Sequence, residues 1–187
     1  MPAKTIQDVI ALAKAKPKTL SYASYGTGSS ADAFGELLNL SAGIDLLHVP
    51  YKGGGPGMVA LMGNEIDMMV AQIPSSKQLH TGGKVRALAI STAKRSSAMP
   101  DVPTMAEQGL PTVEEVNWSA IFAPAKVPSE VMRRLQEALV QSLNDGPLRE
   151  RLAGNGAKRN RRKFAVRGRI ELDRQPSSGR VAVGAHM

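Results

Sequence analysis

Apolar and polar residues alternate between helical and extended patterns along the first 110 positions of the chain. Apolar residues at helical spacing predict a helix over residues 5–16, where Thr5 and Asp8 have the spacing of a capping box. Similar stripes predict short helices over residues 30–43, 58–64 and 74–81. Apolar runs between them predict strands over residues 18–23, 45–51, 65–71 and 84–91. This alternation favours an α/β domain with a largely parallel sheet.

The second half of the chain has a different pattern. A Pro-rich connection with a small helix is expected over residues 96–111, and a strand over residues 115–124. The strongest helical pattern lies over residues 129–144, and another short helix is expected over residues 147–156. The apolar stripe of the strong helix consists of Val131, Leu135, Leu139 and Leu143. The helix over 30–43 is expected to bury Phe34, Leu37, Leu38 and Ser41 and to end at Gly43.

Composition narrows the function classes only slightly. The 187 residues include no cysteine, which excludes disulfides, thiolate metal sites and a cysteine nucleophile. The first residues lack the apolar stretch of a signal peptide, and no run of eighteen apolar residues occurs. The net charge of +8 arises mainly from residues 158–187, which hold 9 basic and 2 acidic residues. The basic character therefore belongs to the tail and not to the globular part.

The turn SYASYGTGSS, residues 21–30, joins a predicted strand to a predicted helix without any charged residue. A helix N-terminus leaves backbone N–H groups unpaired, so an anion is favoured there. Gly26 and Gly28 allow close backbone approach, and the neighbouring Thr and Ser residues add hydroxyl donors. The lysine of a phosphate-binding P-loop is missing, so the turn suits a carboxylate better than a triphosphate. The alternative is an ordinary tight turn with Ser30 as the helix N-cap.

Other candidate sites carry weaker signals. Lys52 precedes the glycines of a second turn after the next strand, where it either attracts an anion or is simply solvated. His48 and His80 have no metal-ligand spacing around them, so we expect no metal site and no cofactor. No serine lies in the G-x-S-x-G motif of a hydrolase, which argues against that class of enzyme.

Three segments, residues 20–70, 83–111 and 123–157, resemble in order the substrate-binding proteins of tripartite tricarboxylate transporters, also called the Bug family. The specific motifs are HVPYKGGGP, RALA, PDVPT and E-x-G-L-P. The resemblance implies a type II periplasmic-binding-protein-like α/β fold with two lobes and a ligand cleft between them. It also implies a non-enzymatic protein that closes on its ligand by hinge motion.

In this family the ligand carboxylate is held by backbone amides and small hydroxyls of facing loops. The resemblance implies that the following residues contribute here: Ser24, Tyr25, Gly26, Thr27, Gly28, Ser29, Ser30, Tyr51, Gly53, Ala71 and Gln72. Three positions depart from the family pattern. Asp32 replaces a histidine and puts a negative charge near the site, Ala71 lacks the usual acidic group, and Tyr25 is bulkier than expected and should narrow the cleft.

The resemblance also implies a domain organisation and partners. Residues 5–109 would form a nearly complete second lobe and residues 110–157 the returning segment of a first lobe, truncated at its amino terminus. The implied partners are a small carboxylate (a di- or tricarboxylate, an aromatic acid or an amino acid) and membrane transporter subunits, without membrane insertion or nucleic acid. The family location is the periplasm, whereas a chain expressed as given, without a signal peptide, would stay in the cytoplasm.

The tail over residues 158–187 leaves two alternatives open. Its Arg-rich run begins abruptly inside the family match, which favours a frameshift near residue 158. The rival is a basic arm that binds nucleic acid or another anionic partner, with Phe164 available to stack on bases. An enzyme that uses the glycine turn for a phosphorylated substrate is the least favoured hypothesis.

Overall fold

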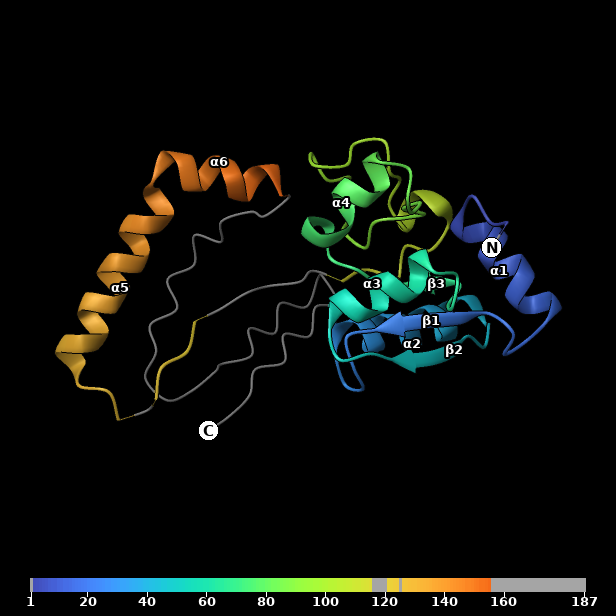
Figure 1. Ribbon diagram of the computed structural model, residues 1–187, viewed down its shortest axis with the longest axis horizontal. Coiled ribbons are helices and arrows are strands. Elements are labelled where there is room, and N and C mark those ends of the chain that lie inside the picture. The colour runs from blue at the N-terminus through green and yellow to red at the C-terminus, as the bar shows by residue number, and fades with distance from the viewer. Residues whose placement is uncertain (1, 116–120, 125, 156–187) are drawn as a thin grey trace. The chain divides into compact units, whose positions relative to one another are not determined.

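The structure, a computed structural model, describes residues 2–115, 121–124 and 126–155 (Figure 1). These residues divide into a larger unit, which includes residues 2–115, and a smaller unit, which contains the long helix α5. The elements of residues 2–115 follow one another as α1 (Ile6–Ala15), β1 (Ser21–Ser24), α2 (Ser30–Ala42), β2 (Leu47–Pro50), α3 (Gly54–Met62), β3 (Met68–Met69), α4 (Ile73–Thr81) and the 3₁₀-helix η1 (Ala106–Gln108).

The three strands form a parallel sheet in the order β2-β1-β3. Tyr22 in the central strand pairs with His48 on one side and with Met68 on the other. Successive residues of a strand face opposite sides of the sheet. Accordingly, Tyr22 packs in the core that contains Leu38 of α2, and Ala23 packs in the core that contains Ala60 of α3. The predicted α/β class with a parallel sheet is confirmed.

The first helix forms as the sequence predicts. The Thr5 side chain accepts the Asp8 N–H and the Asp8 carboxylate accepts the Thr5 N–H, which completes the capping box. The predicted stripe is the buried face of α1, and its members are Ile6, Val9, Ile10 and Ala13.

Helix α2 differs from the prediction in its cap and in its buried face. Ser29, and not Ser30, is the N-cap, because its hydroxyl accepts the Asp32 N–H. The buried residues are Ala31, Gly35 and Leu38, while the predicted stripe member Ser41 is exposed. A Cβ at Gly35 would overlap the Tyr22 ring, so a glycine lets the helix approach the sheet closely. The predicted end at Gly43 is confirmed by its left-handed conformation.

The strand predicted over residues 84–91 is wrong. Only Ile90 forms a bridge, with Thr104, because side chains bond the neighbouring backbone groups in place of a strand. The Leu88 carbonyl accepts the Gln108 side-chain amide, and the Ala87 N–H donates to His80 Nδ1. Ile90 is buried, and the three apolar residues before it are partly buried against the core without joining the sheet.

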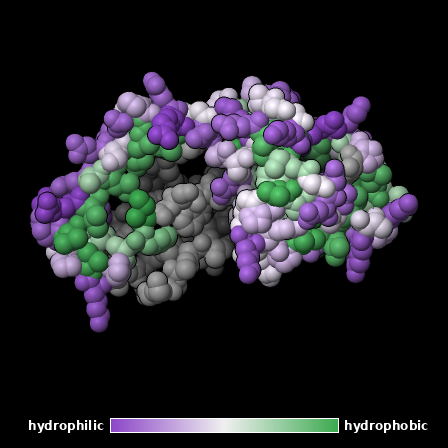
Figure 2. Space-filling model, viewed as in Figure 1, coloured by the Kyte–Doolittle hydropathy of each residue, from purple (hydrophilic) through white to green (hydrophobic). Residues whose placement is uncertain are grey.

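The smaller unit contains α5 (Ser129–Asn144), followed in the chain by α6 (Gly146–Gly154). The predicted helix over 129–144 is confirmed, but Val131, Leu135 and Leu139 are 46%, 53% and 39% exposed. Figure 2 shows hydrophobic residues, in green, gathered over the segment that Figure 1 labels α5. Of the strand expected over 115–124, residues 116–120 lie outside the described residues, and 121–124 form no strand.

No helix within the described residues is both long and apolar enough to cross a membrane. The basic tail, on which the frameshift and nucleic-acid hypotheses depend, lies outside the described residues.

Candidate functional site

The candidate site lies at the carboxyl edge of the sheet, where three parallel strands end together. Each strand passes through a short turn directly into a helix: β1 into α2, β2 into α3 and β3 into α4. Three helix N-termini therefore follow the same edge of one sheet. A helix N-terminus leaves backbone N–H groups without intrahelical partners and carries a partial positive charge, which favours an anionic group there.

The glycine loop, defined here as residues 24–30, is held by its own hydrogen bonds. Gly26 and Gly28 have φ angles of 132° and 78°, which only glycine adopts without strain. The Gly26 N–H donates to the Ser24 hydroxyl at 3.1 Å, and the Ser29 N–H donates to the Gly26 carbonyl at 3.1 Å. The Gly28 N–H donates to Asp32 Oδ2 at 2.7 Å. These bonds fix the loop before any ligand arrives.

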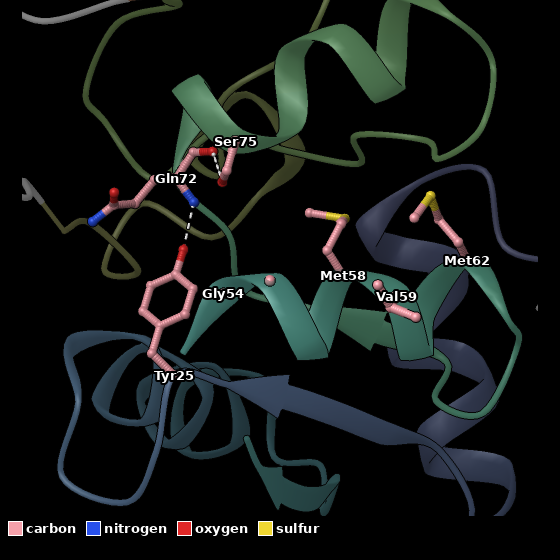
Figure 3. Close-up of a pocket in the computed structure, with 8 residues that line it drawn as sticks. Tyr25, Gly54, Met58, Val59, Met62, Gln72 and Ser75 are labelled. Atoms are coloured by element: carbon pink, nitrogen blue, oxygen red, sulfur yellow. Dashed lines mark hydrogen bonds between the residues drawn. The ribbon is translucent and has the colours of Figure 1, made fainter. Parts of the chain in front are cut away.

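Tyr25 connects the three turns. Its backbone carbonyl accepts the Gly53 N–H at 3.2 Å, and its hydroxyl accepts the Gln72 N–H at 2.6 Å. Its ring lies against Gly54, where an added Cβ would be 3.1 Å from the ring. Figure 3 shows the Tyr25 side chain reaching from the end of β1 to the start of α4. Tyr25 therefore links the starts of α3 and α4 to the end of β1.

An open cavity of about 440 Å³ lies beside Tyr25 (Figure 3). It combines backbone and hydroxyl groups at the starts of α3 and α4 with apolar side chains along α3. The lining residues are Tyr25, Gly54, Gly55, Met58, Val59, Met62, Gln72 and Ser75. Of the predicted site residues it includes Tyr25 and Gln72, and it includes none of residues 26–30.

A second group of side chains lies beneath the glycine loop. Ser24 is fully buried, and its hydroxyl oxygen lies 2.7 Å from His48 Nε2. The other ring nitrogen, Nδ1, lies 3.3 Å from Asp32 Oδ1. This order of serine, histidine and aspartate is that of a hydrolase triad, but a fully buried hydroxyl cannot reach a substrate carbonyl. The Ser24–His48–Asp32 group therefore has a structural role, because Ser24 and Asp32 accept backbone N–H groups of the glycine loop.

Two tyrosines and one carboxylate near the edge have shifted pKa values. Burial raises the pKa of Tyr22, and the Glu36 carboxylate that accepts its hydroxyl at 3.0 Å raises it further. Burial also raises the pKa of Tyr25, which the bond from the Gln72 N–H partly offsets. Burial raises the pKa of the Glu115 carboxyl, while a hydrogen bond with the Ser30 side chain opposes the shift. Glu115 thus places a carboxyl at the glycine loop.

The predicted site residues are largely brought together. Backbone hydrogen bonds join Tyr51 to Ser24 and Gly53 to Tyr25, so the turns after β1 and β2 lie side by side. Thr27 and Ser30 are exposed at the loop, and Ala71 lies next to Gln72 in the third turn. Ser24, however, points its hydroxyl into the protein. Among the described residues, no group of three His, Asp or Glu side chains could hold a metal ion.

Sequence reasoning missed His48, Glu115 and the role of Asp32. His48 was considered only as a metal ligand, yet its pairing opposite Tyr22 places it on the same face as Ser24, two residues along the strand. The strand register, once known, would have revealed it. Asp32 was expected only to put a negative charge near the site, whereas its carboxylate also accepts the Gly28 N–H and contacts His48. Glu115 joins the site from a distant segment and gives no local signal.

Comparisons with known proteins identify the family. Residues 1–164 match the tripartite tricarboxylate transporter family receptor, TctC. The chain belongs to this family. A relative from the TAR-I ttuE-ttuC' intergenic region of Agrobacterium vitis is 37% identical over 82% of this chain and 44% of its own length. The chain thus spans about half the length of the relatives that it matches.

Solved structures of TctC-type proteins agree with the fold. The periplasmic binding protein BugD is 33% identical, with a TM-score of 0.79 over 83% of this chain and 52% of its own. An R. palustris protein with adipate is 30% identical, with a TM-score of 0.79 over 83% and 52%. MatC from Rhodopseudomonas palustris, with bound malate, is 32% identical, with a TM-score of 0.78 over 83% and 53%. TctC proteins are receptors, so family membership confirms the expected non-enzymatic class.

Proposed function

We propose that this TctC-family chain binds a small organic carboxylate at the carboxyl edge of the β2-β1-β3 sheet. The observation that carries the proposal is that three strands deliver three helix N-termini to one edge, where Tyr25 links them. A carboxylate is the anion that best fits backbone amides and hydroxyls without a lysine clamp. The adipate and malate in two structural neighbours support a dicarboxylate.

We further propose that the site forms one side of a cleft in a periplasmic receptor that delivers its ligand to membrane transporter subunits. Residues 5–109 would be the second lobe and residues 110–157 part of the first. Because the chain spans about half the length of its relatives, we expect it to bind weakly by itself. Aromatic acids and acidic amino acids are the other ligands to be tested.

Isothermal titration calorimetry of the complete 187-residue chain with adipate and with malate tests the proposal. Millimolar binding of either dicarboxylate, with no binding of a matched diol, is the expected result. Micromolar binding would contradict the expected weakness of a half-cleft. The absence of binding to every carboxylate at millimolar concentration would overturn the proposed function.

Gly55 offers a variant that separates anion binding from folding. It lies in the first turn of α3, and a Cβ there would meet open space. Gly55→Asp places a carboxylate where the ligand's is proposed to bind, yet an acidic residue stabilises a helix N-terminus. Binding should therefore fall at least tenfold while thermal stability is kept, and Gly55→Asn, the neutral control of the same size, should lose less affinity than Gly55→Asp.

A further inference from the structure

The polar group beneath the glycine loop holds both glycines of that loop. The Ser24 hydroxyl oxygen accepts the Gly26 N–H at 3.1 Å, and Asp32 Oδ2 accepts the Gly28 N–H at 2.7 Å. His48 lies between these two side chains and contacts both, at 2.7 Å and 3.3 Å. One imidazole therefore connects the two anchors of a loop at the sheet edge where the ligand is proposed to bind.

The contacts of His48 fit two protonation states. When the ring is neutral, Nδ1–H donates to Asp32 and the Ser24 hydroxyl donates to Nε2, while Ser24 still accepts the Gly26 N–H. When the ring is protonated, both nitrogens donate, so the Ser24 hydroxyl accepts from Nε2 and turns its proton to another acceptor. The Gly26 carbonyl oxygen lies 3.1 Å away and fills that role. Each state leaves every group of the network with a partner.

The two states differ in charge next to the loop. From α2, the carboxylates of Asp32 and Glu36 lie on the His48 side of the sheet, and Glu36 is connected through the Tyr22 hydroxyl at 3.0 Å. From β1, the Tyr22 ring stacks on His48 at 4.9 Å, and Ser24 completes the surroundings. A neutral His48 leaves both carboxylates to repel an incoming anion, whereas a protonated His48 offsets one of them.

We propose that His48 and Asp32 are positioning residues of the glycine loop, and that protonation of His48 strengthens carboxylate binding there. The inference rests on the proposed binding of a carboxylate at this edge of the sheet. His48 supplies the positive charge that the uncharged turn lacks, from below the loop and without contact with the ligand. Proton uptake should accompany carboxylate binding, because ligand and proton favour the same state.

Calorimetry of the full chain with adipate at pH 6, 7 and 8 tests the charge effect. We expect affinity to be about tenfold higher at pH 6 than at pH 8, as suits one added charge near the site. Titrations at pH 6.5 in two buffers of different ionisation enthalpy should show uptake of a fraction of one proton. In His48→Gln the uptake should vanish, and any remaining pH dependence then reports the ionisation of adipate itself.

Nuclear magnetic resonance of the ligand-free chain tests the positioning role. The Gly26 and Gly28 amide resonances should shift between pH 8 and pH 5.5 with one common titration curve, shared with the His48 ring. In Asp32→Asn the Gly28 amide should lose its dependence on this titration while the Gly26 amide keeps it. A merely structural role of His48 would give no common curve.

His80 provides a matched control, because its Nε2 lies 3.1 Å from Asp101 Oδ2 and the pair is not part of the glycine loop. His80→Gln should leave the adipate affinity, its pH dependence and both loop resonances unchanged. The inference is overturned if the two glycine amides do not titrate, or if His48→Gln keeps the wild-type proton uptake. If no carboxylate binds at any pH while the amides still titrate with His48, the proposed function fails and the loop network stands.

Discussion

The α/β unit and the α5 segment both have clear helical patterns, and that of α5 is the stronger, yet only the α/β unit buries its apolar side chains. In α1 the residues Val9 and Ala13 are 0% and 1% exposed, whereas Leu135 and Leu139 of α5 are 53% and 39% exposed. Periodicity therefore predicts the helix and its apolar side, while burial depends on what packs against that side. Matched substitutions in the two regions test this contrast.

A matched pair of leucines gives the largest contrast. Leu38→Ala, at a fully buried position of α2, should lower the free energy of unfolding by about 2–5 kcal/mol, because it opens a cavity in the core. Leu135→Ala in α5 should cost about 0.5 kcal/mol or less, because its side chain is half exposed. Urea denaturation of the full chain followed by circular dichroism measures both. Equal losses for the two variants would show that the α5 stripe is buried in solution.

A pair of helical glycines tests close packing. Gly35→Ala in α2 should cost about 1–3 kcal/mol, because the new Cβ would overlap the buried Tyr22 ring. Gly146→Ala at the start of α6 should be close to neutral, because no atom lies within 4 Å of the added Cβ. Thermal denaturation compares the two variants. A Gly35→Ala variant as stable as the wild type would mean that α2 does not approach the sheet as closely as described.

Helix capping gives a smaller contrast. Thr5→Ala removes the hydroxyl of the α1 capping box and should cost about 1 kcal/mol. Pro128, the N-cap of α5, provides no side-chain cap, so the first residue of that helix, Ser129, can be changed with less effect. Ser129→Ala, the control, should change stability by less than half as much. Equal effects in a urea titration would contradict the difference between a capped and an uncapped helix.

Sequence patterns predicted most of the fold because its local signals are strong. The capping box at Thr5, the left-handed Gly43 and the apolar stripe of α1 are decided within one helix, so the sequence alone suffices. The strand expected over residues 84–91 failed because pairing depends on distant groups. There the side chains of Gln108 and His80 bond the backbone, and only Ile90 pairs.

The part of the candidate site that a local backbone turn forms could be predicted from the sequence. The part that depends on the register of the strands could not. Gly26 and Gly28 carry the positive φ angles that the turn needs, and both were named from the sequence. The contact of Ser24 with His48 arises because the strand pairing places His48 beside Tyr22. Tyr22 and His48 are 26 residues apart in the sequence. The Tyr25 bonds to Gly53 and Gln72 likewise depend on which strands are neighbours.

The smallest expected effect comes from removing the charge of Glu115, whose carboxyl lies at the glycine loop. Burial raises the pKa of Glu115 above its ordinary value of 4.5, so the native state binds this proton more tightly than the unfolded state. Stability contributed by Glu115 therefore falls as pH rises through the interval between the unfolded and the raised folded pKa, and stays low at neutral pH. Glu115→Gln removes this loss.

The Glu115→Gln variant should accordingly be more stable than the wild type at pH 7, by about 0.3 kcal/mol, because the half-exposed position screens the charge. The gain should largely disappear near pH 4, where the carboxyl is mostly protonated in both states. Glu114→Gln removes an equal charge at the exposed neighbouring position and should show no such pH-dependent gain. Urea denaturation at pH 4 and pH 7 separates the two variants. A loss of stability in Glu115→Gln at pH 7 would mean that the ionised carboxylate gains more from the Ser30 hydrogen bond than it loses by burial, and that Glu115 braces the loop in its charged form.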